Sequence, residues 1–130
     1  MNGAIAGLYA ALTTVLLVVL GYRIAKLRMR HRVGLGDGGV AELQQAIRAH
    51  GNLVEYAPLA LLLLLAAELS GAAPPTVLHA LGAAFVAARM AHAFGISRNP
   101  ARSPGRFWGT LLTWGTMLVL AVLLLAKALR

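Results

Sequence analysis

The chain has 130 residues, of which 59% are hydrophobic and 12% are charged, and it contains no cysteine. A soluble domain of this size would carry roughly twice that share of charged residues, so the composition indicates an integral membrane protein. The lack of cysteine excludes a disulfide, a thiolate nucleophile and a thiolate-bound metal. The net charge of +8 would suggest a nucleic-acid partner in a soluble protein. In so apolar a chain we instead attribute it to basic residues that set the orientation of the protein in the membrane.

The first apolar segment, residues 3–22, contains no charged side chain. Its length matches the ~20 residues that a helix needs to cross a hydrocarbon layer of ~30 Å. A secretory signal is the alternative interpretation. However, the segment lacks a basic n-region, and "YRIAKLRMRHR" follows it in place of a small-residue cleavage site. We therefore predict a first transmembrane helix.

Three further apolar segments follow, each preceded by a stretch rich in glycine or proline. The second, residues 40–69, follows "GLGDGG", and the third, residues 76–96, follows "SGAAPP". The fourth, residues 107–129, follows "SRNPARSPGR". Glycine and proline at these places are typical of helix ends. The sequence thus predicts an all-α fold, an integral membrane four-helix transmembrane bundle that forms a single domain over residues 1–130.

The basic residues are concentrated in two of the three predicted connections, which contain eight of the twelve lysines and arginines. Cytoplasmic connections of membrane proteins carry an excess of such residues. We therefore expect both basic connections in the cytoplasm and both termini on the opposite side. The eight residues are Arg23, Lys26, Arg28, Arg30 and Arg32 in the first connection, and Arg98, Arg102 and Arg106 in the other.

Polar residues interrupt the first half of the second segment at helical spacing. Arg48, Asn52, Glu55 and Tyr56 stand at i, i+4, i+7 and i+8, so a helix places them on one face, whereas His50 points away. Ionisable residues within a membrane span are costly, and they normally have a partner and a purpose. The second segment is therefore the first candidate for a functional site.

The third segment carries a second polar cluster, because Arg89 and His92 are three residues apart and share a helix face. Glu55 and His92 each lie 18 to 19 residues from the turn between Ala73 and Pro74. At ~1.5 Å per residue, antiparallel helices would place both about 28 Å from that turn. We therefore expect the two clusters at one level, near the cytoplasmic face.

Such a cluster is suited to a polyanionic, zwitterionic ligand. Arginine binds carboxylates through paired hydrogen bonds, Glu55 is suited to an ammonium group, and a guanidinium would favour the thiolate form of a ligand thiol. Two alternatives remain open from the residues alone. Arg48 and Glu55 form a structural ion pair in the first alternative, and His92 binds haem with His50 or His79 in the second.

At these residues the sequence resembles a known family. "RAHGNLVEYAPL", residues 48–59, is similar to the second-helix signature R-A-x-x-N-x-x-E-[YFT]-x-P of the MAPEG family, the membrane-associated proteins of eicosanoid and glutathione metabolism. "ARMAHAFG", residues 88–95, resembles the third-helix segment of that family. "HRVGLGDGG" and "ELQQAIRAH" resemble its bacterial branch, and the chain as a whole resembles a microsomal glutathione transferase.

The resemblance implies a homotrimer in a bacterial inner membrane, with glutathione as cosubstrate bound between adjacent subunits near the cytoplasmic face. It implies membrane lipids and a lipophilic small-molecule substrate as further partners, and no metal. The glutathione-binding residues that it implies are Arg48, Asn52, Glu55, Tyr56, Arg89 and His92, together with Arg28 or Arg30 reaching across the interface. Arg106 or Arg102 would stabilise the thiolate.

The sequence departs from the family at two places. Well-studied members have a tyrosine where this chain has Ile96, and the loop "SRNPARSPGRF", which precedes the fourth helix, contains two prolines next to the candidate arginines Arg102 and Arg106. Two functions follow as hypotheses. The first is a glutathione transferase or peroxidase that presents the thiolate to electrophiles or hydroperoxides dissolved in the bilayer. The second is a non-catalytic trimeric membrane protein that binds anionic lipid through its basic cytoplasmic loops.

Overall fold

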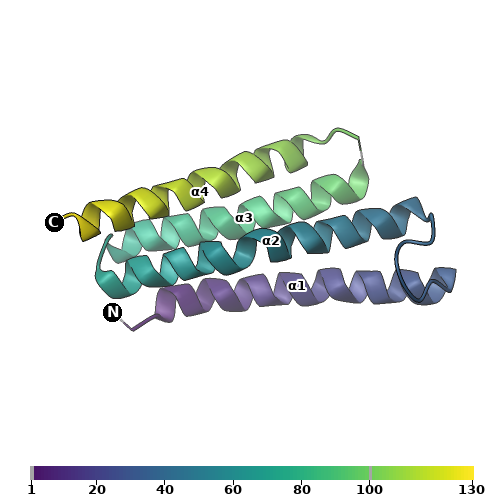
Figure 1. The fold of residues 1–130 in the computed structure, drawn as a ribbon, viewed down its shortest axis with the longest axis horizontal. Helices are drawn as coiled ribbons and strands as arrows, with labels where there is room; N and C mark the ends of the chain where they lie inside the picture. The colour runs from purple at the N-terminus through teal and green to yellow at the C-terminus, as the bar shows by residue number, and fades with distance from the viewer. Residues whose placement is uncertain (1, 100) are drawn as a thin grey trace.

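The computed structural model describes residues 2–99 and 101–130, which form four helices and three short connections. The helices are α1 (Ala4–His31), α2 (Ala41–Ser70), α3 (Pro75–Arg98) and α4 (Pro104–Ala128). They run antiparallel to their neighbours in sequence, with both termini at one end and the α1–α2 and α3–α4 connections at the other (Figure 1). All four are long and apolar enough to cross a membrane. The predicted fold class is therefore confirmed.

The first helix is longer than predicted, because it ends at His31 rather than near residue 22. Ile24 and Leu27 of this extension pack with Leu43 and Ala46 of α2, so the helix has a small core of its own beyond the apolar span. Lysine and arginine are good helix formers, and cations are favoured at a helix C-terminus. The prediction that this basic segment is a connection was therefore wrong for Arg23, Lys26, Arg28 and Arg30, which are helical.

The last connection is also shorter than predicted. Helix α3 includes Arg98, and α4 begins at Pro104, three residues before the predicted start. Proline is favoured in the first turn of a helix, where its missing N–H needs no partner. Arg106 is consequently a residue of the first turn of α4, and Arg102 lies in the connection.

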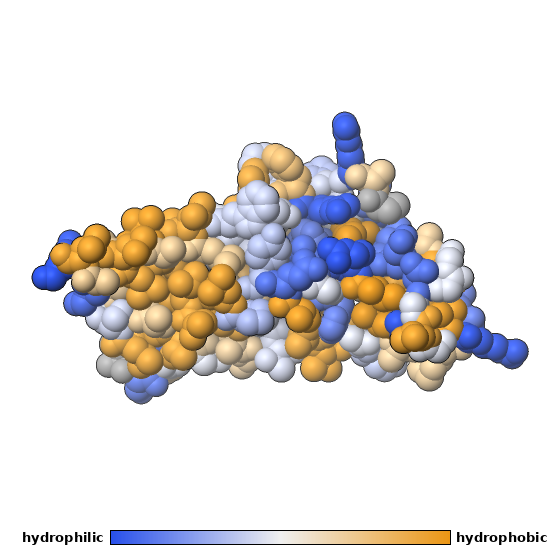
Figure 2. Space-filling view, in the orientation of Figure 1, coloured by the Kyte–Doolittle hydropathy of each residue, from blue (hydrophilic) through white to orange (hydrophobic). Residues whose placement is uncertain are grey.

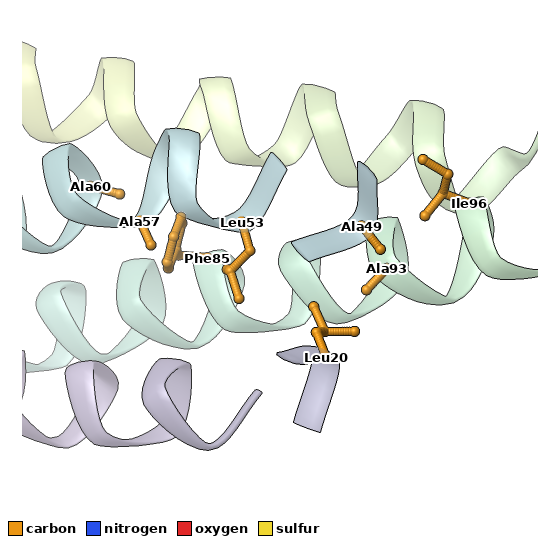
Figure 3. Close-up of a cluster of buried hydrophobic side chains, with 8 residues drawn as sticks. All are labelled: Leu20, Ala49, Leu53, Ala57, Ala60, Phe85, Ala93 and Ile96. Carbon is orange, nitrogen blue, oxygen red and sulfur yellow. The ribbon is translucent and has the colours of Figure 1, made fainter. Parts of the chain in front are cut away.

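The core lies along the axis of the bundle in two main clusters. Figure 3 shows the one nearer to the α1–α2 and α3–α4 connections, where Leu20 of α1, Leu53 of α2 and Phe85 and Ile96 of α3 meet. Outward-facing leucines and valines, among them Leu118, which is 66% exposed, cover much of the outside of the bundle. Such a surface suits contact with lipid chains, which are as apolar as these residues.

A buried carboxylate that sequence reasoning missed fastens the end of the bundle that carries the termini. Glu68 of α2 is 2% exposed and accepts hydrogen bonds from the backbone N–H groups of Ile5 (3.2 Å) and Ala6 (2.8 Å) in the first turn of α1. The first N–H groups of a helix have no partner within the helix, and a negative charge is favoured beside them. Glu68 thereby fixes the start of α1 against α2.

Glycines permit a close approach of α3 and α4 near their connection. A Cβ atom at Gly95 would lie 2.5 Å from the backbone nitrogen of Arg106, and one at Gly109 would lie 2.6 Å from the carbonyl oxygen of Ala88. Likewise, a Cβ atom at Gly105 would lie 2.7 Å from the carbonyl oxygen of Ala91. Small residues allow two membrane helices to bring their backbones together. The position of Arg106 is therefore set by backbone packing.

Candidate functional site

Arg89 is the centre of the candidate site. Its side chain is 2% exposed and lies between α2, α3 and α4. It donates a hydrogen bond to Oδ1 of Asn52, and it also donates one to the carbonyl oxygen of Gly109 (3.2 Å). Its guanidinium carbon lies 5.4 Å from the centre of the Tyr56 ring, a cation–π distance. Arg89 thus holds the polar face of α2 in place.

Tyr56 extends this network to the fourth helix. Its hydroxyl oxygen accepts a hydrogen bond of 3.0 Å from the indole nitrogen of Trp114, a residue that sequence reasoning did not single out. A tryptophan on α4 has no motif that marks it as part of the site, since exposed aromatic residues are common near membrane interfaces. The hydrogen bond fixes the direction in which the phenol of Tyr56 points.

His92 is 4% exposed and packs directly against α4, where a Cβ atom at Gly109 would lie 2.9 Å from its backbone nitrogen. Three cations and one carboxylate act electrostatically on its ring, and the largest cationic influence is that of Arg89. The structure therefore brings most of the predicted residues of α2, α3 and α4 into one neighbourhood around His92. The other three charged groups are Arg106, Arg48 and Glu55.

Arg48 and Glu55 form an ion pair of 3.3 Å on the outer side of α2. Their side chains are 55% and 53% exposed, although both lie in a helix that is long and apolar enough to span a membrane. The alternative of an ion pair within the subunit is thus realised, but this pair is not buried inside the bundle. An exposed charge pair within a span calls for a partner or for water.

A small cavity of about 110 Å³ lies beside this ion pair. Arg48 and Arg106 line it together with Ile96, the residue that replaces the family tyrosine. Two glutamines complete the lining, and sequence reasoning did not select them. They precede Arg48 by four and three residues, so helical spacing could have placed them on its face. These glutamines are Gln44 and Gln45.

A larger hollow of about 770 Å³ runs along the outside of the first half of α4. Arg102 and Arg106 lie at its polar end, and aromatic and aliphatic side chains form most of the remaining wall. Arg106 lines both this hollow and the small cavity, so it stands between a polar and an apolar compartment. The apolar residues are Phe107, Trp108, Leu111 and Trp114.

The candidates from the first helix lie elsewhere in the subunit. Arg28 donates a hydrogen bond of 2.7 Å to the carbonyl oxygen of Gly36 and lines a separate hollow beside the α1–α2 connection. Arg30 is exposed on α1. The structure of one subunit therefore does not bring either residue to Arg48 and Arg106, and a role across an interface stays a prediction.

The histidines proposed as haem ligands are not grouped. His79 accompanies Tyr9 near the start of α3, thirteen positions before His92, which corresponds to ~20 Å along a helix. His50 faces α1, where its ring lies 3.8 Å from the place of a Cβ atom on Gly21. No group of three metal-binding side chains occurs in residues 2–99 and 101–130.

Four membrane-length helices around a buried arginine, with an ion pair on the outside of α2, define a multi-span membrane protein with a polar centre at one end. The sequence model of the MAPEG family matches residues 6–126, and the chain belongs to that family. Membership confirms the resemblance that residues 48–59 and 88–95 predict.

Two similar proteins have been named from Escherichia coli. Inner membrane protein YecN of strain K12 is 39% identical over 118 residues, which cover 91% of this chain and 88% of YecN. Inner membrane protein YecN of strain O6:H1 (CFT073) has the same identity and the same coverage. These relatives are thus similar to this chain over nearly the full length of both.

Proposed function

We propose that this chain is a glutathione-binding membrane protein, and that it acts as a glutathione transferase or peroxidase on lipophilic substrates. The observation that carries the proposal is the position of Arg106, which lines both the cavity beside Arg48 and the apolar hollow along α4. A thiol at this boundary meets a guanidinium on one side and a compartment suited to an apolar substrate on the other.

The charges around the cavity match the charges of glutathione, a tripeptide with two carboxylates and one ammonium group. Arg48 would bind a carboxylate and Glu55 the ammonium group, so glutathione would replace the ion pair that the two residues form with each other. Asn52, whose Oδ1 is held by Arg89, retains its amide N–H groups for a peptide carbonyl. The residues present therefore fit this ligand chemically.

The cavity is too small to hold the whole tripeptide, since ligand pockets usually measure ~300–1,000 Å³. Arg48 lines the cavity, and both it and its ion-pair partner Glu55 are about half exposed. A neighbouring subunit would supply the rest of the wall and would also cover two charges that are costly to expose to lipid. We therefore propose a homotrimer with the site between subunits, to which Arg28 or Arg30 of a neighbour would contribute.

The reaction requires the sulfur of glutathione as a thiolate. Arg106 or Arg102 would stabilise that negative charge, and the thiol proton would leave to water. In the transferase reaction the sulfur lone pair forms a carbon–sulfur bond, and the leaving group departs with its bonding electrons. In the peroxidase reaction two thiols are oxidised to a disulfide, and the hydroperoxide is reduced to an alcohol and water.

For the location we propose the bacterial inner membrane, in line with the names of the two relatives. The end of the bundle that carries the α1–α2 and α3–α4 connections would face the cytoplasm, because it contains eight of the twelve basic residues. Figure 2 supports this placement, since hydrophilic residues gather on the visible face toward that end and hydrophobic residues cover much of the other half.

The test is a titration of the purified oligomer with glutathione, followed by heat of binding and by the ultraviolet absorbance of the thiolate. We expect Arg48→Gln to weaken binding about 10- to 100-fold, because a hydrogen bond to a charged group contributes ~1.5–3 kcal/mol. Arg106→Gln is expected to retain binding but to lower the thiolate absorbance at saturation. Lys127→Gln, which removes a positive charge at the opposite end of the bundle, serves as the control.

S-methyl glutathione separates the two readouts, because it can bind but cannot form a thiolate. If glutathione bound without thiolate absorbance, the proposed binding of glutathione would stand and the proposed transferase or peroxidase activity would be refuted. If the wild-type oligomer gave neither heat nor absorbance at millimolar glutathione, the proposal would be wrong, and the polar residues would be assigned to subunit association.

A further inference from the structure

A second hollow lies on the outside of the bundle, where α3 ends and α4 begins. It measures about 550 Å³, within the ~300–1,000 Å³ range of ligand pockets. Its polar part contains Arg98, Asn99, Arg102 and Ser103. Its apolar part includes Phe94 and continues along α3 toward the middle of the bundle. We name it the α3–α4 hollow.

The two arginines of the α3–α4 hollow face no carboxylate of their own chain. In residues 2–99 and 101–130, neither Arg98 nor Arg102 lies within ion-pair distance of an acidic side chain. The chain has only four acidic residues, and each is engaged elsewhere. Asp37 accepts from Gly39, Glu42 lies 4.0 Å from His31, Glu55 pairs with Arg48, and Glu68 caps α1. The positive charge of the hollow is therefore left for an external anion.

The level of the hollow indicates the source of that anion. Phe94, Phe107 and Trp108 are 63%, 59% and 65% exposed near this end of α3 and α4. Tryptophan is enriched at the boundary between hydrocarbon and headgroups, so the exposed Trp108 is the residue that indicates this boundary near the start of α4. Arg98 follows Phe94 by one helical turn, which places it ~6 Å further out along α3. With Trp108 at the boundary, Arg98 would lie on its headgroup side, where lipid phosphates are found.

We propose that the α3–α4 hollow binds the phosphate of an anionic phospholipid, with Arg98 and Arg102 on the phosphate and an acyl chain beside Phe94. Guanidinium groups pair with phosphate oxygens through two parallel hydrogen bonds. This hollow shares neither Arg48 nor Arg106 with the cavity, but it shares Arg102 with the apolar hollow along α4, so Arg98, which has no part in the proposed glutathione site, is the residue that tests the lipid proposal alone. It assigns a single lipid to one defined place on each subunit.

The intrinsic tryptophans provide the measurement. The chain has two, Trp108 and Trp114, and both lie on α4 in the hollow that shares Arg102 and Ser103 with the α3–α4 hollow. The protein is reconstituted in phosphatidylcholine vesicles that contain a small fraction of brominated lipid, which quenches tryptophan fluorescence. Brominated phosphatidylglycerol is compared with brominated phosphatidylcholine at equal fractions, and the ratio of quenching gives the preference for the anionic lipid.

We expect the wild-type protein to prefer phosphatidylglycerol. Arg98→Gln should lower that preference about fivefold, since one basic residue near an anionic lipid surface contributes a factor of that order. Arg98→Gln combined with Arg102→Gln should abolish it, and Arg98→Lys should largely restore it. Lys26→Gln combined with Arg32→Gln removes two exposed cations at the C-terminal end of α1 and should leave the preference unchanged.

Three results would overturn the proposal. Equal quenching of the wild type by both lipids would show that no anionic lipid is selected. An equal loss in the control variant with Lys26→Gln and Arg32→Gln would show that the whole basic end attracts anionic lipid without a defined site. Inorganic phosphate that relieves the quenching more than sodium chloride of the same ionic strength would show that free phosphate occupies the hollow. Glutathione is absent from every arm, so the outcome does not depend on the proposed function.

Discussion

The hydrogen bond between Arg89 and Asn52 can be measured as a coupling energy, using Arg89→Met, Asn52→Leu and the variant with both substitutions. Methionine approximates the length of the buried arginine side chain, and leucine the size of the asparagine. In Arg89→Met the Oδ1 of Asn52 loses its donor, whereas in the double variant both polar groups are gone. The cycle therefore removes the desolvation cost of the guanidinium from the comparison.

The expected magnitude follows from the surroundings of the bond. Hydrogen bonds to charged groups contribute ~1.5–3 kcal/mol, and hydrogen bonds between membrane helices measure ~0.6–1.7 kcal/mol. Both ranges apply to the bond from Arg89 to Asn52, because its donor is charged and it lies between two membrane helices. The ranges overlap at ~1.5 kcal/mol, so we expect a coupling energy of about 1.5 kcal/mol. The second acceptor of Arg89, the carbonyl oxygen of Gly109, should not contribute to this coupling energy. It also accepts a hydrogen bond from the Thr113 hydroxyl (2.8 Å), so it keeps a donor when Arg89 is replaced.

The assay is reversible unfolding in mixed micelles, monitored by tryptophan fluorescence at one fixed protein concentration, because the stability of the proposed homotrimer would depend on concentration. Trp114 is a suitable probe, since its indole nitrogen is bonded to Tyr56 within the same network. The matched control is a cycle of Arg98→Met with Asn52→Leu, in which an exposed arginine of the same helix is removed. A coupling below ~0.5 kcal/mol for the Arg89 cycle, equal to that of the control, would refute the reasoning.

Two further predictions concern the stability of the fold. Glu68→Gln should lower the free energy of unfolding by about 1–2 kcal/mol, because a neutral amide loses the favourable charge at the start of α1, whereas the exposed Glu42→Gln should change it by less than ~0.5 kcal/mol. Equal effects of both substitutions in a denaturant titration would contradict the capping role. Gly109→Ala should destabilise by about 1–3 kcal/mol, because its Cβ atom would lie 2.6 Å from the Ala88 carbonyl oxygen. Gly115→Ala meets no atom within 4 Å and should stabilise by ~0.5–1 kcal/mol, so a gain in both variants would show that α3 and α4 are not in tight contact.

The sequence was sufficient to predict the four membrane helices and the level at which their polar faces meet. Both rest on regular quantities, namely the length of an apolar run and the rise of a helix. Counting from the turn between α2 and α3 placed the two polar clusters at one level, but it did not predict the bond from Arg89 to Asn52, which joins residues 37 positions apart. The polar residues of the spans stood out because such residues are rare in lipid.

Features without regular spacing were missed. The basic end of α1 resembled a loop because hydropathy detects only the apolar part of a helix, whereas Leu27 packs beyond that part. Glu68 binds backbone N–H groups 62 and 63 positions earlier, and a backbone group leaves no mark in the sequence. Gln44 and Gln45 gain significance only from the cavity that they share with Arg106.

The contact between Gly95 and Arg106 has a consequence for how this chain and its relatives can diverge. Residue 95 has no ionisable or polar group, yet the hydrogen atom in place of a side chain decides where the first turn of α4 lies. A descendant with alanine at this position would keep every arginine of the chain and still present the guanidinium of residue 106 from a displaced helix. A comparison of charged residues alone would not detect this displacement, so the small residues of α3 should be compared together with the arginines.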